Sequence, residues 1–175
     1  MSLNVVFEPN EHEHSELIRS ITEILESTQL WSMATVSPSG TPHINTAYFS
    51  YDENFRFYFI TSPHTQHGKF IEANPEVAVS IFSTDHPWQE VPFRGIQLWG
   101  KARNLHVLAS PTDARASYCN RFPKAADWIG PEKQESRSDV HDRFFDLEPT
   151  RLKLFDEKLF GQHTLIELKI ADSYS

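Results

Sequence analysis

The sequence has little cysteine: Cys119 is the single one, so no disulfide can form within the chain. It contains no apolar run approaching the roughly 18–20 residues that a membrane-spanning helix needs. The first residues lack the basic stretch and apolar run of a secretory signal peptide. Together these absences predict a protein of the reducing cytoplasm that does not associate with a membrane.

Positive charge is also scarce, because 16 lysine and arginine residues stand against 24 aspartates and glutamates. The net charge of −8 and the lack of a basic cluster argue against a nucleic-acid partner, whose phosphates would be repelled. Hydrophobic residues make up 39% of the chain and aromatic residues 13%, which is typical of a globular fold. We therefore expect the partners to be a small-molecule substrate and a second copy of the chain.

Helix and strand patterns follow one another in a clear order. Residues 11–28 carry Leu17 and Ile21 at helical spacing, which predicts an N-terminal helix. After residue 29 the apolar positions alternate with a period of two, and turn signals such as Pro38-Ser39-Gly40 separate these stretches. The strands predicted in this way span residues 30–37, 41–51, 55–61, 77–82, 93–105, 145–155 and 165–170, and the helices span 65–73, 111–121 and 124–129.

An antiparallel sheet of this length exposes open edges unless it closes on itself. The sequence therefore predicts a mostly β protein with peripheral helices, in which six or seven antiparallel strands form a barrel. We expect one domain over residues 1–175, with a helical segment at 1–29, the barrel core at 30–105, and helices and closing strands at 106–175. The polar stretch 130–139 is predicted to be a flexible loop.

The segment between the third and fourth predicted strands carries a particular order of residues. Thr61 ends a strand, a short helix follows, and Asn74-Pro75-Glu76-Val77 leads into the next strand. The strand after that contains Gly100-Lys101-Ala102. This order and spacing resemble the FMN-binding split-barrel family of pyridoxamine 5′-phosphate oxidase, and from residue 118 onward an uncharacterised bacterial subgroup of it.

This resemblance implies a split β-barrel of the FMN-binding type, a homodimer, and FMN held at the subunit interface. The flavin would perform the redox chemistry, so an FMN-dependent oxidoreductase acting on a small molecule is the preferred function. No side chain identifies itself as catalytic. Oxidation of pyridoxamine phosphate itself is not expected, because residues 152–161 do not resemble the closing segment that supplies a substrate-binding arginine in that enzyme.

The start of the short helix is the predicted phosphate site, because helix N-termini present free N–H groups and a positive dipole end. Thr61 and Thr65 offer hydroxyls, Gln66 an amide, and His67 and Lys69 positive charge. The resemblance assigns the two threonines as phosphate ligands, while Gln66 and His67 stand where the family has arginine and lysine. We therefore expect FMN to bind less tightly above about pH 7, as His67 loses its proton.

The flavin ring needs polar groups at its pyrimidine edge, and the resemblance places them on the second strand. That stretch corresponds to Asn45, Thr46 and Ala47 here. A glutamine that the family carries on a later strand falls on Gly95, and Gln97 shares its face and could replace it.

Several alternatives stay open at this stage. The protein could be a non-catalytic flavin-binding or sensing protein, or it could hold haem or a deazaflavin in the same groove. The segment from Thr61 to Lys69 could also be an ordinary polar loop between a strand and a helix. A metal site is not favoured, because His64 and His67 lack a third ligand at zinc-like spacing. Cys119 is expected to be a small buried residue, and the tryptophans to lie in the core or at an interface.

Overall fold

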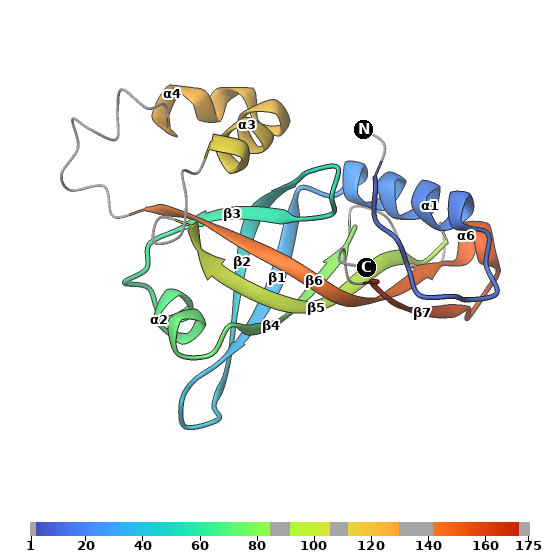
Figure 1. The fold of residues 1–175 in the computed structure, drawn as a ribbon, viewed down its shortest axis with the longest axis horizontal. Coiled ribbons are helices and arrows are strands. Elements are labelled where there is room, and N and C mark those ends of the chain that lie inside the picture. The colour runs from blue at the N-terminus through green and yellow to red at the C-terminus, as the bar shows by residue number, and fades with distance from the viewer. Residues whose placement is uncertain (1–2, 85–91, 106–111, 130–141, 172–175) are drawn as a thin grey trace.

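The computed structural model describes residues 3–84, 92–105, 112–129 and 142–171 (Figure 1). The predicted loop at 130–139 lies outside these ranges. The elements are α1 (His14–Ser27), β1 (Leu30–Val36), β2 (Pro42–Tyr51), β3 (Phe57–Thr61), α2 (Gln66–Ala73), β4 (Glu76–Phe82), β5 (Arg94–Asn104), α3 (Thr112–Arg121), η2 (Pro123–Ala125), α4 (Ala126–Ile129), β6 (Arg143–Asp156), α6 (Glu157–Phe160) and β7 (Leu165–Lys169).

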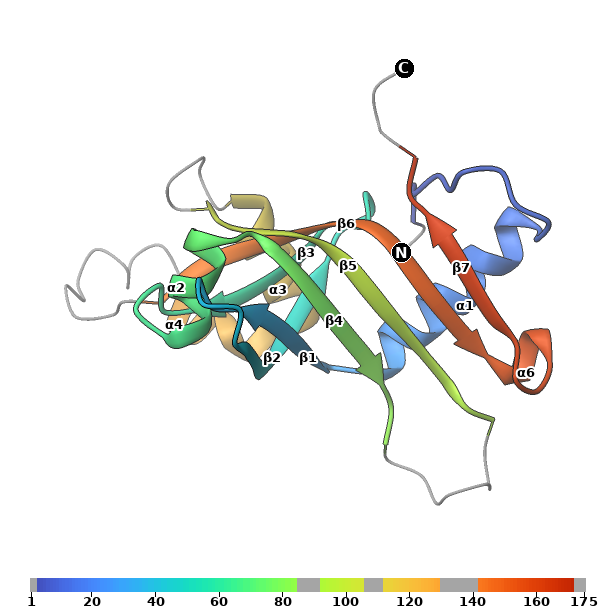
Figure 2. The same ribbon diagram turned by 90° about the horizontal axis from the view of Figure 1, so that it is seen from below.

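The strands form one antiparallel sheet that closes into a barrel. Their order is β3-β2-β1-β4-β5-β6-β7, and β3 also pairs with β6, so that β1 to β6 close and β7 is one additional strand. The prediction of a mostly β antiparallel barrel with peripheral helices is confirmed. Helices α1 and α2 lie toward opposite ends of this barrel (Figures 1 and 2).

The barrel is split between β2 and β3. Strand β2 pairs with β1 from Pro42 to Tyr48, but it pairs with β3 only over Phe49–Tyr51. On its other side β3 pairs with β6 from Phe57 to Thr61. As a result, the edge of β2 over residues 42–48 has no ladder to a second strand among the described residues.

Inward-pointing side chains of the strands form the core of the barrel. Phe57 and Phe59 point inward and are fully buried, and Trp31 stacks on Phe49 with ring centroids 5.2 Å apart. The opposite face of β3 is also covered, because Tyr58 joins a second, smaller cluster beneath α3 and α4. That cluster includes Cys119, half-buried, as a packed neighbour.

Gly95 and Gly100 of β5 mark close approaches to neighbouring groups. The register of β5 on β6 shifts between Trp99 and Gly100. A Cβ on Gly100 would lie 2.2 Å from the carbonyl oxygen of Glu148, and one on Gly95 would lie 2.0 Å from the ring of Phe82. Neither position therefore accommodates a side chain without a shift of its neighbours.

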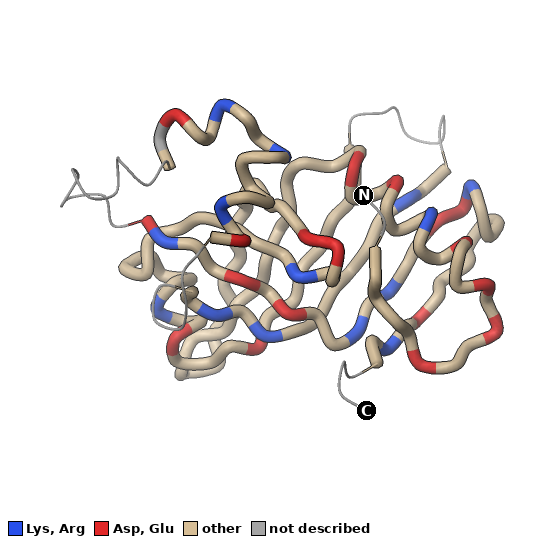
Figure 3. Tube along the Cα trace, turned by 45° about the horizontal axis from the view of Figure 1, so that its top comes forward, with Lys and Arg blue, Asp and Glu red and all other residues tan. Residues whose placement is uncertain are grey.

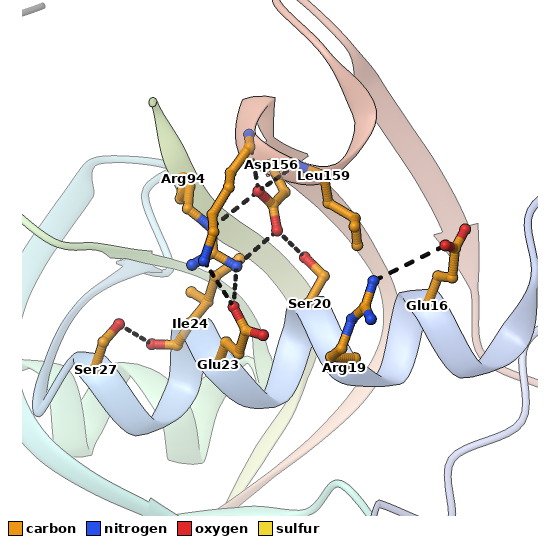
Figure 4. Close-up of polar contacts among 10 residues, drawn as sticks. Glu16, Arg19, Ser20, Glu23, Ile24, Ser27, Arg94, Asp156 and Leu159 are labelled. Carbon is orange, nitrogen blue, oxygen red and sulfur yellow. Dashed lines mark hydrogen bonds and ion pairs between the residues drawn. The ribbon is translucent and has the colours of Figure 1, made fainter. Parts of the chain in front are cut away.

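Helix α1 is fastened to the barrel by a buried polar cluster (Figure 4). The side chain of Asp156 is fully buried; it accepts hydrogen bonds from Ser20 Oγ at 2.5 Å and from Arg94 Nε at 2.9 Å and Nη2 at 2.7 Å. It also caps α6 by accepting from the N–H groups of Lys158 and Leu159. Burial alone would raise the pKa of Asp156, but the hydrogen bonds from Arg94 and Ser20 outweigh it and hold the pKa below its usual value.

Charges of both signs are interspersed along the described part of the chain, without a cluster of basic residues (Figure 3). Among the helices that the structure describes, none is both long and apolar enough to cross a membrane.

Candidate functional site

The turn into α2 is built around Thr65. Its Oγ1 accepts a hydrogen bond from the N–H of Gly68 at 3.1 Å and donates to the carbonyl oxygen of Ser62 at 2.7 Å. This is the N-cap arrangement that starts a helix. The N–H groups of Gln66 and His67 have no hydrogen-bond partner among the described residues, so both are available to an anion.

Gly68 lets the preceding loop fold tightly over this first turn. A Cβ at this position would lie 2.7 Å from the carbonyl oxygen of Ser62 and 2.8 Å from that of Pro63. Any other residue would therefore push the loop away from the start of the helix, and the pair of free N–H groups would lose its fixed position.

His67 links the start of α2 to the end of β3. Its Nε2 lies 2.6 Å from Oγ1 of Thr61, which in turn lies 3.5 Å from Oγ1 of Thr65. The ring of His67 stacks on the ring of His43 from β2, with centroids 5.9 Å apart and planes 8° from parallel. Burial, followed by the neighbouring His43, lowers the pKa of His67.

Polar groups on the inner face of β1 and β2 extend this corner into the split. Thr35 lies directly opposite His43 in the register and is fully buried with an unpartnered hydroxyl. Asn45, two residues along β2, has a buried side-chain oxygen without a partner. Buried acceptor atoms usually have a hydrogen-bond donor as partner. The imide N–H of a flavin is such a donor, and the side-chain oxygen of Asn45 is placed to accept a hydrogen bond from it. The residues present therefore fit FMN at both its phosphate and its ring.

The sequence-predicted site residues divide into two groups in space. Thr61, Thr65, Gln66 and His67 come together at the start of α2, although Gln66 is exposed. Asn45 lies on the inner face of the neighbouring strand.

The other predicted residues lie outside this corner. Ala47 packs against the core, while Thr46 points outward with its hydroxyl 3.4 Å from that of Ser32. Lys69 is exposed on α2. Gln97 is on the outer face of β5, three strands from β2 in the sheet order, which is about 14 Å at the usual spacing between strands.

The sequence reasoning missed two residues of the corner. His43 shares the inner face of β2 with Asn45, so the alternation of the strand could have placed it there. Arg143 is the direct cross-strand neighbour of Thr61 on β6, and only the closure of β3 onto β6 brings it there. Arg143 adds a guanidinium beside a site in which Gln66 and His67 stand at the positions expected to hold arginine and lysine.

A cavity of about 790 Å³ lies away from this corner and includes none of the predicted site residues. Arg56, Arg103 and Glu148 are among the residues that line it. Both arginines lie 3.6 Å from the buried carboxylate of Asp146, and both also pair with Glu148. The charged side chains of this cavity therefore form ion pairs with one another. We therefore take the start of α2, and not this cavity, as the candidate functional site.

An antiparallel barrel closed by β3 and β6 and split between β2 and β3 defines the class of split-barrel proteins. A sequence model described as pyridoxamine 5′-phosphate oxidase matches residues 17–156, and the chain belongs to this family.

Other proteins resemble this chain in sequence or in structure. A UPF0306 protein of Photorhabdus laumondii is 28% identical over 109 residues, covering 62% of this chain and 74% of that protein. The structure of a heme-binding protein from Mycobacterium smegmatis superposes with a TM-score of 0.67 at 15% identity, over 92% of this chain and 60% of that one. A Clostridium acetobutylicum protein related to general stress protein 26 gives a TM-score of 0.63 at 14% identity, over 90% and 96% of the two chains. At these identities the two structures demonstrate a common fold alone.

Proposed function

We propose that this protein binds FMN, with the phosphate at the start of α2 and the ring in the split between β2 and β3. The observation that carries the proposal is the convergence of the Thr61 hydroxyl, the His67 imidazole and the two N–H groups of Gln66 and His67 at a corner whose geometry the Thr65 N-cap fixes. A dianionic phosphate needs such a set of donors, and the dipole of α2 adds to it. Asn45 beside the corner supports placing the ring in the split.

Bound FMN would supply hydride or electron transfer, which makes a flavin-dependent oxidoreductase acting on a small molecule the proposed activity. In this proposal the chain's own residues bind and orient the flavin. Thr61 and His67 hold the phosphate, Thr65 fixes the helix start that presents the N–H groups to it, and Asn45 orients the pyrimidine edge of the ring.

The proposal includes a homodimer formed through the outer face of β1 and β2. The apolar side chains on this face are unusually exposed: Ile44 by 66%, Tyr48 by 52% and Leu30 by 44%. They lie in register, with Leu30 opposite Tyr48 and Ala34 opposite Ile44. The pair Ser32 and Thr46 lies between these apolar pairs on the same face. Exposed large apolar side chains gathered on one face favour association. Gln97 also faces outward, so it would contact the flavin of the partner rather than its own.

The ligand is tested by titrating the ligand-free protein with FMN, riboflavin and haem, following flavin fluorescence or haem absorbance. We expect FMN to bind at least tenfold more tightly than riboflavin, because only FMN carries the phosphate. Thr61→Val should remove most of this preference, and Thr41→Val, at an exposed turn, should leave it intact. Equal binding of FMN and riboflavin would contradict the phosphate site.

Haem is the main alternative ligand for the split between β2 and β3, because a heme-binding protein is among the structural neighbours. Tight haem binding, with a Soret band and no FMN binding, would replace the flavin proposal. If FMN binds, oxidation of NADH or NADPH by the loaded protein separates an oxidoreductase from a non-catalytic flavin-binding protein.

The dimer is tested by sedimentation of the wild-type protein and of Ile44→Glu. We expect the variant to be a monomer that stays folded, because Ile44 is exposed within one subunit. Its FMN affinity should fall if the partner contributes Gln97. A wild-type monomer that binds FMN with full affinity would rule out a shared site.

A further inference from the structure

Two imidazole rings meet at the proposed phosphate corner, and they come from different elements. His67 is the second residue of α2 and His43 is the second residue of β2. Their rings stack at 5.9 Å, and Phe70 packs edge-on against His43 at a centroid distance of 6.0 Å. The pair is therefore held in place by packing, with Thr61 bound to Nε2 of His67.

We propose that His43 and His67 act as a proton-coupled clamp, in which FMN phosphate binds together with one proton taken up by the histidine pair. This inference rests on the proposed FMN site and adds a function for His43. Two stacked rings cannot both carry a positive charge without mutual repulsion, so the pair accepts one proton rather than two. A dianion beside the pair favours that proton, and by linkage the proton favours the dianion.

Without an anion beside it, the protonated form of His67 is disfavoured. Burial and the neighbouring His43 both lower the pKa of His67. The Thr61 hydroxyl can donate to Nε2 of a neutral ring, and its oxygen can accept from a protonated one. Thr61 therefore stays bonded to His67 in both states, and its hydroxyl hydrogen becomes free for the phosphate when the ring is charged.

The charged side chains around the histidine pair do not supply the positive charge that the proton would bring. Strand β1, which packs on α2, carries no titratable side chain, and Lys101 of β5 lies 3.9 Å from Glu76. On the helix and its preceding loop, Lys69, Glu72 and His64 are exposed.

The arginines of β5 already have acidic partners. Arg103 pairs with Asp146 and Glu148, and Arg94, at the α1 end of the strand, pairs with Asp156 and Glu23. Arg143, opposite Thr61, adds a guanidinium beside the corner. The proposed pH dependence rests on the two histidines.

The experiment is calorimetric titration of FMN into the protein between pH 7 and 8.5, in Tris and in HEPES, which differ in ionisation enthalpy. FMN phosphate is already dianionic in this range, so protons taken up come to the protein. We expect close to one proton per FMN and an affinity that falls roughly tenfold per pH unit. Riboflavin, which has no phosphate, should bind with no proton uptake.

Three variants separate the roles of the rings. His67→Asn should abolish the proton uptake and flatten the pH profile. His43→Asn removes the ring that, after burial, lowers the pKa of His67, so the fall in affinity should move to higher pH. His163→Asn, in the turn before β7, is the matched control and should behave as the wild type. Thermal unfolding of each variant checks that it is folded.

The outcomes distinguish this inference from the function on which it rests. FMN binding with no proton uptake, or with uptake unchanged in His67→Asn and His43→Asn, would refute the clamp and leave the FMN site standing. If FMN does not bind at any pH, the proposed function is wrong and the clamp with it.

Discussion

Replacing Asp156 by asparagine should destabilise the protein strongly, because this carboxylate fastens three elements together. Its side chain is fully buried and holds Ser20 of α1, Arg94 of β5 and the N-terminus of α6 (Figure 4). Breaking a buried ion pair by removing one partner costs about 3–5 kcal/mol. Arg94 keeps its contact with Glu23 at 2.9 Å, which favours the lower end of that range.

We therefore expect Asp156→Asn to lower the free energy of unfolding by about 3 kcal/mol. For a chain of this length that corresponds to a fall in Tm of roughly 6–12 °C. Urea and thermal unfolding at pH 7 measure both quantities. Glu23→Gln is the matched control, since its carboxylate is 43% exposed and exposed pairs contribute at most about 1 kcal/mol.

The contribution of Asp156 to the free energy of unfolding should depend on pH. The pKa of Asp156 is lower in the folded protein than its usual value, so its contribution is present above about pH 4 and is lost as the pH falls through the folded pKa. The difference between the wild type and Asp156→Asn should stay constant from about pH 5 to pH 8 and narrow below about pH 4. A variant within about 1 kcal/mol of the wild type at pH 7 would refute the reasoning.

Three further predictions concern the site and the core. Gly68→Ala should weaken FMN binding at least tenfold in fluorescence titration, because its Cβ would meet two backbone carbonyls; Gly40→Ala strains a turn with nothing within 4 Å and should leave binding unchanged. Arg121→Leu should lower the free energy of unfolding by about 2–3 kcal/mol, because two carbonyls at the end of α1 lose their donor; a stable variant in urea would contradict this. Trp31→Ala should cost about 3–5 kcal/mol, whereas Trp31→Phe should cost only about 1–2 kcal/mol because the buried indole N–H has no partner to lose; equal Tm values for the two variants would contradict the packing argument.

The sequence alone determined most of the local structure. A period of two with turn residues between the stretches placed the seven strands, because alternation of side chains is a property of the extended backbone itself. The start of α2 was also readable, since Thr65 caps the helix through neighbours only three residues away in either direction. The ends of the predicted elements differ from those in the structure by a few residues. Helix α1, for example, begins at His14 and not at residue 11. The short α6 was missed, because its cap depends on Asp156 at the end of a strand.

The tertiary structure decided which of these residues meet. Pairing of β3 with β6 closes the barrel, opens the split beside β2, and places Arg143 next to Thr61, although 82 positions separate them in the chain. The register of the sheet sets Gln97 and Thr46 on its outer face, away from Asn45, with which the resemblance grouped them at the flavin ring. His43 joins His67 because α2 packs across the end of β2. Local patterns fix the conformation of each segment, but contacts between distant segments depend on register and closure, which the whole sheet determines.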